Sequence, residues 1–150
     1  MTQNNNTKER FIERMGIIAQ NDGLPRIAGR LMGLLVLEGG PFSFSELAER
    51  LKVSRGSTST NARLLENMGV IERTAIAGDR QDYYQLAKDP YTKLLQGLAY
   101  RMKGAETLVL ETQKALPKDD SQDRLQDLGD FYSGMIGAYQ QIIESMKDGE

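Results

Sequence analysis

Residues 43–69 read SFSELAERLKVSRGSTSTNARLLENMG, and this stretch decides the fold. Ser43 or Ser45 can cap a short helix, because their side-chain oxygens accept hydrogen bonds from free backbone N–H groups. The buried side of this predicted helix consists of Leu47, Ala48 and Leu51. The pattern then breaks within about three residues at Lys52, so the chain is expected to turn tightly there.

A second helix is predicted directly after that turn. Ser54 provides its N-cap, Met68 lies at its end and Gly69 closes it. Its inner face is predicted from helical spacing to carry Thr58, Ala62, Leu65 and Met68. Two helices joined by so short a turn are typical of a helix-turn-helix motif, whose second helix enters the major groove of DNA. An ordinary helical hairpin within a bundle is the alternative interpretation.

The outer face of the second predicted helix favours DNA. It carries short hydroxyl and amide side chains, which are poor helix formers but allow close approach to phosphates and base edges. Residues 52–64 also contain three basic residues and no acidic one, although the chain as a whole has a net charge of -2. The predicted DNA contacts on this segment are Ser54, Arg55, Ser57, Ser59, Thr60, Asn61 and Arg63.

Two β-branched or aromatic runs follow, at residues 70–74 and 81–86, and Gly78-Asp79 between them has the composition of a turn. A hairpin placed after a helix-turn-helix is the wing of a winged helix. Arg80 lies at the predicted tip, where a guanidinium can enter a narrow minor groove. Asp79 is expected to orient that guanidinium.

Residues 24–90 resemble the MarR-type winged-helix regulators of bacteria and archaea, most closely the GbsR-like branch, which is linked to choline and glycine betaine uptake. The segments that carry the resemblance are LAERL (47–51), VSRGSTSTN (53–61), LENMGVI (65–71) and GDRQDYY (78–84). The resemblance implies a homodimeric DNA-binding regulator.

The flanking segments are predicted to be helical. One helix is expected over residues 7–20, another over residues 91–116, and the last helix follows a polar linker. The expected domains are an N-terminal helical arm (1–23), the winged helix-turn-helix (24–90) and a C-terminal dimerisation region (91–150). The fold class is therefore mainly α with a small β-hairpin wing, flanked by helical dimerisation arms.

The last helix carries a regular apolar seam, with spacings that alternate between three and four residues as in a coiled coil. The seam, and hence the predicted dimer contact, consists of Leu125, Leu128, Tyr132, Met135, Tyr139, Ile142 and Met146. Packing of this seam within one monomer is compatible with the same pattern. A dimer is favoured, because one recognition helix reads too few base pairs to specify an operator.

Four aromatic residues of the C-terminal region suggest a cage for a quaternary ammonium effector: Tyr100, Phe131, Tyr132 and Tyr139. A core role is the more common reason for aromatic residues at helical spacing. The cage is a hypothesis that the family resemblance motivates.

Composition excludes most enzyme designs. The chain has no Cys and no His, so thiolate chemistry, imidazole metal sites and the usual triads are absent. The acidic run at residues 119–123 lacks the glycine and closing glutamate of a calcium loop. We expect no catalysis, metal or cofactor, and no membrane association, because no apolar run approaches the ~20 residues that span a bilayer. A cytoplasmic transcriptional regulator, by class a repressor, is the leading interpretation, and a protein-interaction module without DNA binding is the alternative.

Overall fold

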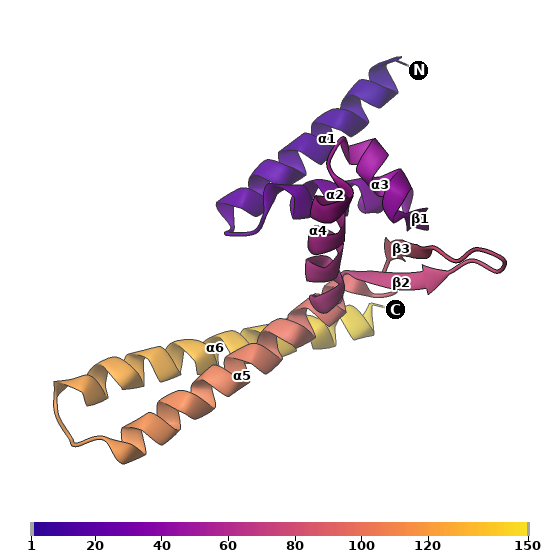
Figure 1. Ribbon diagram of the computed structural model, residues 1–150. Coiled ribbons are helices and arrows are strands. Elements are labelled where there is room, and N and C mark those ends of the chain that lie inside the picture. Colours follow the sequence, from indigo (N-terminus) through magenta and orange to yellow (C-terminus); the bar gives the residue numbers. More distant parts are fainter. Residues whose placement is uncertain (1, 150) are drawn as a thin grey trace. The chain divides into compact units, whose positions relative to one another are not determined.

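The computed structural model describes residues 2–149, and these divide into two compact units that meet in sequence between Pro90 and Tyr91 (Figure 1). The elements in chain order are α1 (Thr2–Asn21), α2 (Arg26–Glu38), β1 (Phe42–Ser43), α3 (Phe44–Leu51), α4 (Arg55–Asn67), β2 (Ile71–Ala75), β3 (Asp82–Leu86), α5 (Pro90–Ala115) and α6 (Asp120–Asp148). The expected fold class is confirmed: the chain is mainly helical, with a helix-turn-helix followed by a small antiparallel sheet.

The boundaries of the helix-turn-helix are fixed by two serine caps. Ser43 forms a full capping box at the start of α3: its Oγ accepts from the backbone N–H of Glu46, whose carboxylate accepts from Ser43 N. Lys52 ends α3 in the left-handed conformation, with φ of 57°. Ser54 then caps α4, because its Oγ accepts from the backbone N–H of Ser57. Only two residues therefore separate the turn at Lys52 from the first residue of α4.

One core holds the first unit together. Leucines of α2, α3 and α4 are buried together with Ile71 of β2 and Tyr84 of β3. Tyr84 is fully buried, and its ring lies 4.8 Å from the ring of Phe44. This core packs α4 against α2, α3 and the sheet, which fixes the position of α4 within the unit.

The sheet has three strands in the order β1-β3-β2, rather than the two of the predicted hairpin. β3 pairs antiparallel with β2, from Ile71 opposite Leu86 to Ala75 opposite Asp82. The added strand, β1, places Phe42 opposite Tyr84. Two residues are too short for a period-2 pattern, which is why the sequence does not reveal this strand.

The N-terminal helix begins at Thr2, five residues before the predicted start, and packs mainly against α2. The two helices approach closely at Gly29. A Cβ at this position would lie 2.5 Å from the Cβ of Ala19 and would overlap the backbone of Met15. Glycine at residue 29 therefore allows α1 to pack directly against α2. Helix α1 belongs to the same compact unit as the helix-turn-helix.

The second unit is an antiparallel pair of long helices. Contacts join Thr92 to Met146, Val109 to Gly129 and Gln113 to Gln126. The side chain of Gln122 closes the loop end, since its Nε2 donates to the carbonyl oxygens of Gln113, Leu116 and Pro117. Asp119 caps α6 by accepting from Ser121 N.

Candidate nucleic-acid interface

Helix α4 and its N-cap contain all the residues that the sequence assigned to DNA except Arg80. Ser54, Arg55, Thr60 and Arg63 are exposed, and Ser57 and Ser59 are half-buried. Hydroxyls of this helix bond back to the backbone, as Thr58 Oγ1 donates to Ser54 O and Thr60 Oγ1 to Gly56 O. These bonds occupy donors but leave oxygen lone pairs free to accept.

Asn61 differs from its expected position on the outer face. Its side chain is only 6 % exposed, and its Nδ2 donates to Ser57 O at 2.8 Å. The reason lies in the helical spacing, which places Asn61 in the same inward stripe as Thr58 and Leu65. Its buried Oδ1 has no hydrogen-bond partner among the described residues. Asn61 supports the helix from inside in this conformation.

The basic residues of the first unit differ in whether an acidic side chain neutralises them. Arg26, Arg30, Arg50 and Arg73 form ion pairs with acidic side chains within the unit. No ion pair is found within residues 2–149 for Arg10 and Arg14 of α1 or for Lys88, which follows β3. The exposed cations of the turn, α4 and the wing are likewise without one in that range: Lys52, Arg55, Arg63 and Arg80. These four unpaired cations form one functional candidate, because unneutralised charge at recognition elements is available to phosphates.

The wing tip is ordered by Asp79 rather than by Arg80. Asp79 Oδ2 accepts from Tyr83 Oη at 2.5 Å, and its Oδ1 accepts from Gln81 N at 2.9 Å. The Tyr83 hydrogen bond is the main reason why the pKa of Asp79 lies below its ordinary value. Both carboxylate oxygens are thus engaged, and the expected Asp79–Arg80 pairing is not formed. Arg80 stays exposed.

Arg73 of β2 links the base of the wing to α4. Its Nη2 donates to Glu66 of α4 at 3.3 Å, its Nη1 lies 3.6 Å from Asp82 of β3, and its guanidinium stacks over the Tyr84 ring. Burial raises the pKa of the Tyr84 hydroxyl. Sequence reasoning missed this tie, although the Glu66–Arg73 separation of seven residues spans the turn between helix and strand.

The apolar seam that the sequence predicts on α6 is partly packed within the second unit and partly exposed. Ile143, next to the seam, is buried in the second unit, whereas Leu128 and Ile142 remain exposed. The other five seam residues are half-buried: Leu125, Tyr132, Met135, Tyr139 and Met146. Intramonomer packing therefore uses only part of the seam, and its remainder is open to a further surface.

The four aromatic residues of the proposed cage do not converge in the second unit. Phe131 and Tyr132 contact each other, with ring centroids 5.8 Å apart. Tyr100 is 80 % exposed on α5, and Phe131 also lies largely in solvent. The described side chains thus form no enclosed aromatic box.

Residues 2–149 contain neither a helix that could span a membrane nor a cluster of acidic side chains that could hold a metal ion.

A helix-turn-helix followed by an antiparallel wing defines a winged-helix protein. Residues 22–82 match the model of the MarR family, a segment that includes all eight predicted DNA contacts. A crystal structure of a transcriptional regulator is 31 % identical and superposes with a TM-score of 0.85, covering 95 % of this chain and 99 % of that chain. The chain belongs to the MarR family of transcriptional regulators.

Two curated relatives share part of the sequence. The HTH-type transcriptional regulator MmpR5 of Mycobacterium tuberculosis is 46 % identical over 82 residues, which cover 54 % of this chain and 50 % of MmpR5. The HTH-type transcriptional repressor OpcR of Bacillus subtilis is 27 % identical over 84 residues, covering 56 % and 45 %. The chain spans about half the length of the curated relatives it matches.

Proposed function

We propose that this protein is a sequence-specific, DNA-binding transcriptional regulator. The observation that carries the proposal is that the turn, α4 and the wing together present four exposed cations without an ion pair in the described structure, whereas Arg30, Arg50 and Arg73, which support these elements, are neutralised by acidic side chains. Structural surface cations gain little from staying unpaired, whereas DNA-contacting ones must keep their charge available.

Roles follow from position along the motif. Arg63, Ser57, Ser59 and Thr60 face outward from α4 and would read or position the major groove. Ser54 and Arg55, at the N-terminus of α4, would hold phosphate, because the free N–H groups and the helix dipole favour anions there. Arg80 would enter the minor groove.

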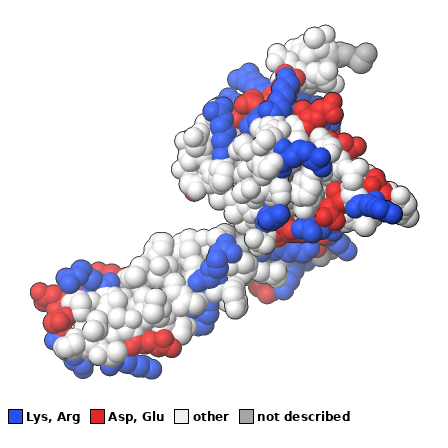
Figure 2. Space-filling view, in the orientation of Figure 1, with Lys and Arg blue, Asp and Glu red and all other residues white. Residues whose placement is uncertain are grey.

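The same proposal includes a homodimer on a pseudo-palindromic operator. The second unit exposes large apolar side chains, including Leu108 at 64 % and Leu128 at 42 %. On the face shown in Figure 2, charged side chains gather toward the loop end of this helical hairpin, and much of its middle is uncharged. An exposed apolar surface of this kind is typical of an interface.

Repression, a cytoplasmic location and membership of the GbsR-like branch extend the proposal. Repression is supported by the name of the OpcR relative, and the location by the proposed DNA partner. A quaternary ammonium effector would require Tyr100, Tyr132 and Tyr139 to converge across the dimer, since they form no box within one unit. Calorimetry with choline or glycine betaine at millimolar concentration tests this part separately, and absence of heat would remove it.

The proposal is tested by titrating the protein with random duplex DNA over a range of salt concentrations. DNA binding predicts a shift at low salt that is lost steeply as salt rises. The Arg55→Gln/Arg63→Gln double variant should weaken binding and reduce the salt slope by at least about 0.9, because Arg55 is assigned to phosphate and each phosphate that is no longer neutralised lowers the slope by about 0.9. Lys114→Gln/Lys118→Gln removes equal charge near the loop of the second unit and should change binding much less. No shift of the wild type at any salt would support a protein-interaction module instead.

A further inference from the structure

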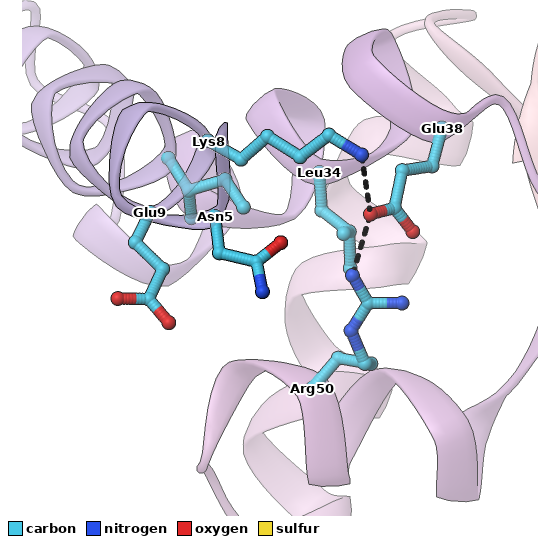
Figure 3. Close-up of a pocket in the computed structure, with 7 residues that line it drawn as sticks. Asn5, Lys8, Glu9, Leu34, Glu38 and Arg50 are labelled. Atoms are coloured by element: carbon cyan, nitrogen blue, oxygen red, sulfur yellow. Dashed lines mark hydrogen bonds and ion pairs between the residues drawn. The ribbon is translucent and has the colours of Figure 1, made fainter. Parts of the chain in front are cut away.

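Two ion networks converge on the last turn of α3. In the first, Glu38 at the end of α2 accepts from Arg50 Nη2 at 2.6 Å, and the same carboxylate oxygen lies 3.7 Å from Lys8 Nζ of α1. Figure 3 shows both cations pointing at that oxygen. The bond to Arg50 is the main reason why the pKa of Glu38 lies below its ordinary value. Arg50 also stacks over the ring of Phe42 in β1.

The second network reaches the neighbouring residue. Arg30 of α2 donates from Nε to Glu13 Oε1 of α1 at 2.8 Å, and from Nη2 to Leu51 O at 2.8 Å. A carbonyl in the last turn of a helix has no partner within that helix, so Arg30 satisfies a free acceptor at the negative end of α3. Glu13 holds the guanidinium in the orientation that makes this bond.

The residues that these two networks hold in place directly precede the turn that sets the direction of α4. Arg50 and Leu51 precede Lys52, which takes the left-handed conformation from which the chain passes into α4. A change in the position of residues 50 and 51 is therefore carried into the direction of α4. Both networks involve residues of α1 and α2. These two helices are in close contact at Gly29, where there is no room for even a methyl group.

We infer that Glu13 and Glu38 are positioning residues for DNA recognition: acting through Arg30 and Arg50, they fix the last turn of α3 and so hold α4 in its reading orientation. The inference rests on the proposed function and extends it to residues on α1 and α2. Each carboxylate is directed at an arginine within the protein rather than outward from α4 or the wing. Their effect must therefore be indirect.

The chain contains a matched control. Glu9 of α1 lines the same cavity of about 260 Å³ as Lys8, Glu38 and Arg50 (Figure 3). No hydrogen bond or ion pair of Glu9 is found within residues 2–149. Glu9→Gln thus removes one negative charge from the same region without breaking either network. Comparison with Glu38→Gln cancels the general effect of charge on DNA affinity.

The first measurement compares affinity for an operator, selected from random duplexes with the purified wild-type protein, with affinity for random duplex. Relative to Glu9→Gln, Glu13→Gln and Glu38→Gln should each lower operator affinity about three- to tenfold, the size expected when a charge-assisted bond is removed, and the double variant more. Random-duplex affinity should match that of Glu9→Gln, because phosphate contacts tolerate small changes in helix direction. Equal operator affinity in all three single variants would overturn the inference.

The second measurement needs no DNA and separates this inference from the proposed function. Amide hydrogen exchange of the free protein should accelerate over residues 52–58 in Glu13→Gln and Glu38→Gln, and remain as in wild type in Glu9→Gln. Exchange of the core strand at residues 82–86 should be unchanged in all of them, which excludes general destabilisation. Unchanged exchange over residues 52–58 would contradict the inference even for a protein that binds DNA. Failure of wild type to bind operator, with exchange accelerated as expected, would contradict the role in DNA recognition but not the fixing of the last turn of α3 and of α4 by Glu13 and Glu38.

Discussion

Tyr83 holds Asp79 across the base of the wing tip, with 2.5 Å between the tyrosine hydroxyl and Asp79 Oδ2. Because the other carboxylate oxygen accepts from Gln81 N, Asp79 organises the turn around Arg80 without pairing with it. The guanidinium is thus presented on an ordered loop with its charge available. An ordered loop loses less conformational entropy when it binds, which favours affinity.

The first prediction concerns Arg80 itself. Arg80→Ala should leave the free energy of unfolding within ~0.5 kcal/mol of wild type, because this exposed side chain has no ion pair in the described structure. Operator affinity should fall, and most for operators with A·T-rich flanks, whose narrow minor groove concentrates negative potential. Titration against two operators that differ only in flanking A·T content checks this. Equal binding of both proteins to both operators would place the wing away from the minor groove.

The second prediction concerns the bond that orders the wing. The Tyr83 hydrogen bond lowers the pKa of Asp79, so the stabilisation it provides is present above the unfolded-state pKa and is lost as pH falls through the folded-state value. The same bond raises the pKa of Tyr83, so the tyrosine's contribution is lost only as alkaline pH rises through its folded-state pKa. In Tyr83→Phe, the pKa of Asp79 should move back toward its ordinary value.

Carboxyl chemical shifts followed by NMR across the acidic range measure this change directly. Asp119 provides the internal comparison: its pKa is lowered by hydrogen bonds from Ser121, not from Tyr83, and should be the same in Tyr83→Phe as in wild type. Operator affinity at neutral pH should fall by a few-fold in Tyr83→Phe if order at the tip supports Arg80. An unchanged Asp79 titration would show that the Tyr83 bond is absent in solution.

Local rules explain which parts of the helix-turn-helix could be predicted. Ser54 and Gly69 mark boundaries that depend only on neighbouring backbone groups, and the structure has them where the sequence indicated. Of the two serines predicted as possible caps of the preceding helix, Ser43 is the one that caps it. Asn61 lies on the buried side of α4, although its polarity favours the outer face. Its spacing of three residues from Thr58 and four from Leu65 puts it on the buried stripe, where the amide bonds to the preceding turn.

Features that depend on distant partners could not be read from the sequence. Strand β1 exists because Phe42 lies opposite Tyr84, a partner far along the chain. Likewise, Glu38 and Arg30 look like ordinary solvated charges until folding brings Arg50 and Leu51 to them. The assignments of DNA and dimer contacts remain predictions, because each concerns a second molecule.

The third prediction tests the close packing of α1 against α2 at Gly29. Gly29→Ala should destabilise the first unit by about 1–3 kcal/mol, since the added methyl group overlaps Ala19 and the Met15 backbone. Gly104→Ala in α5 is the matched control, because a Cβ there meets nothing within 4 Å. The control should be neutral or stabilising by up to ~1 kcal/mol through helix propensity. Denaturant unfolding measures both, and equal effects would mean that the helices are not in close contact at Gly29.

The fourth prediction tests the proposed dimer. Tyr139→Glu places a carboxylate in the middle of the α6 seam, where burial without a partner is unfavourable, so the variant should sediment as a monomer. Gln140→Glu adds the same charge at the adjacent exposed position and should sediment as wild type. A dimer that survives in Tyr139→Glu would place the seam wholly within the monomer.

The last prediction separates base reading from phosphate binding on α4. Arg63 lies two turns beyond Arg55, and neither guanidinium is paired in the described structure, so their different roles must come from position. Arg63→Ala should cost about 1–3 kcal/mol on the operator and relax sequence preference if the guanidinium contacts a base edge. Arg55→Ala should weaken operator and random duplex alike and reduce the salt slope by about one unit, as expected for a phosphate contact. Titrations of both variants on both DNAs at two salt concentrations decide between these roles. If Arg63→Ala weakens binding to operator and random duplex equally, Arg63 binds phosphate, and sequence reading must come from the hydroxyls of Ser57, Ser59 and Thr60.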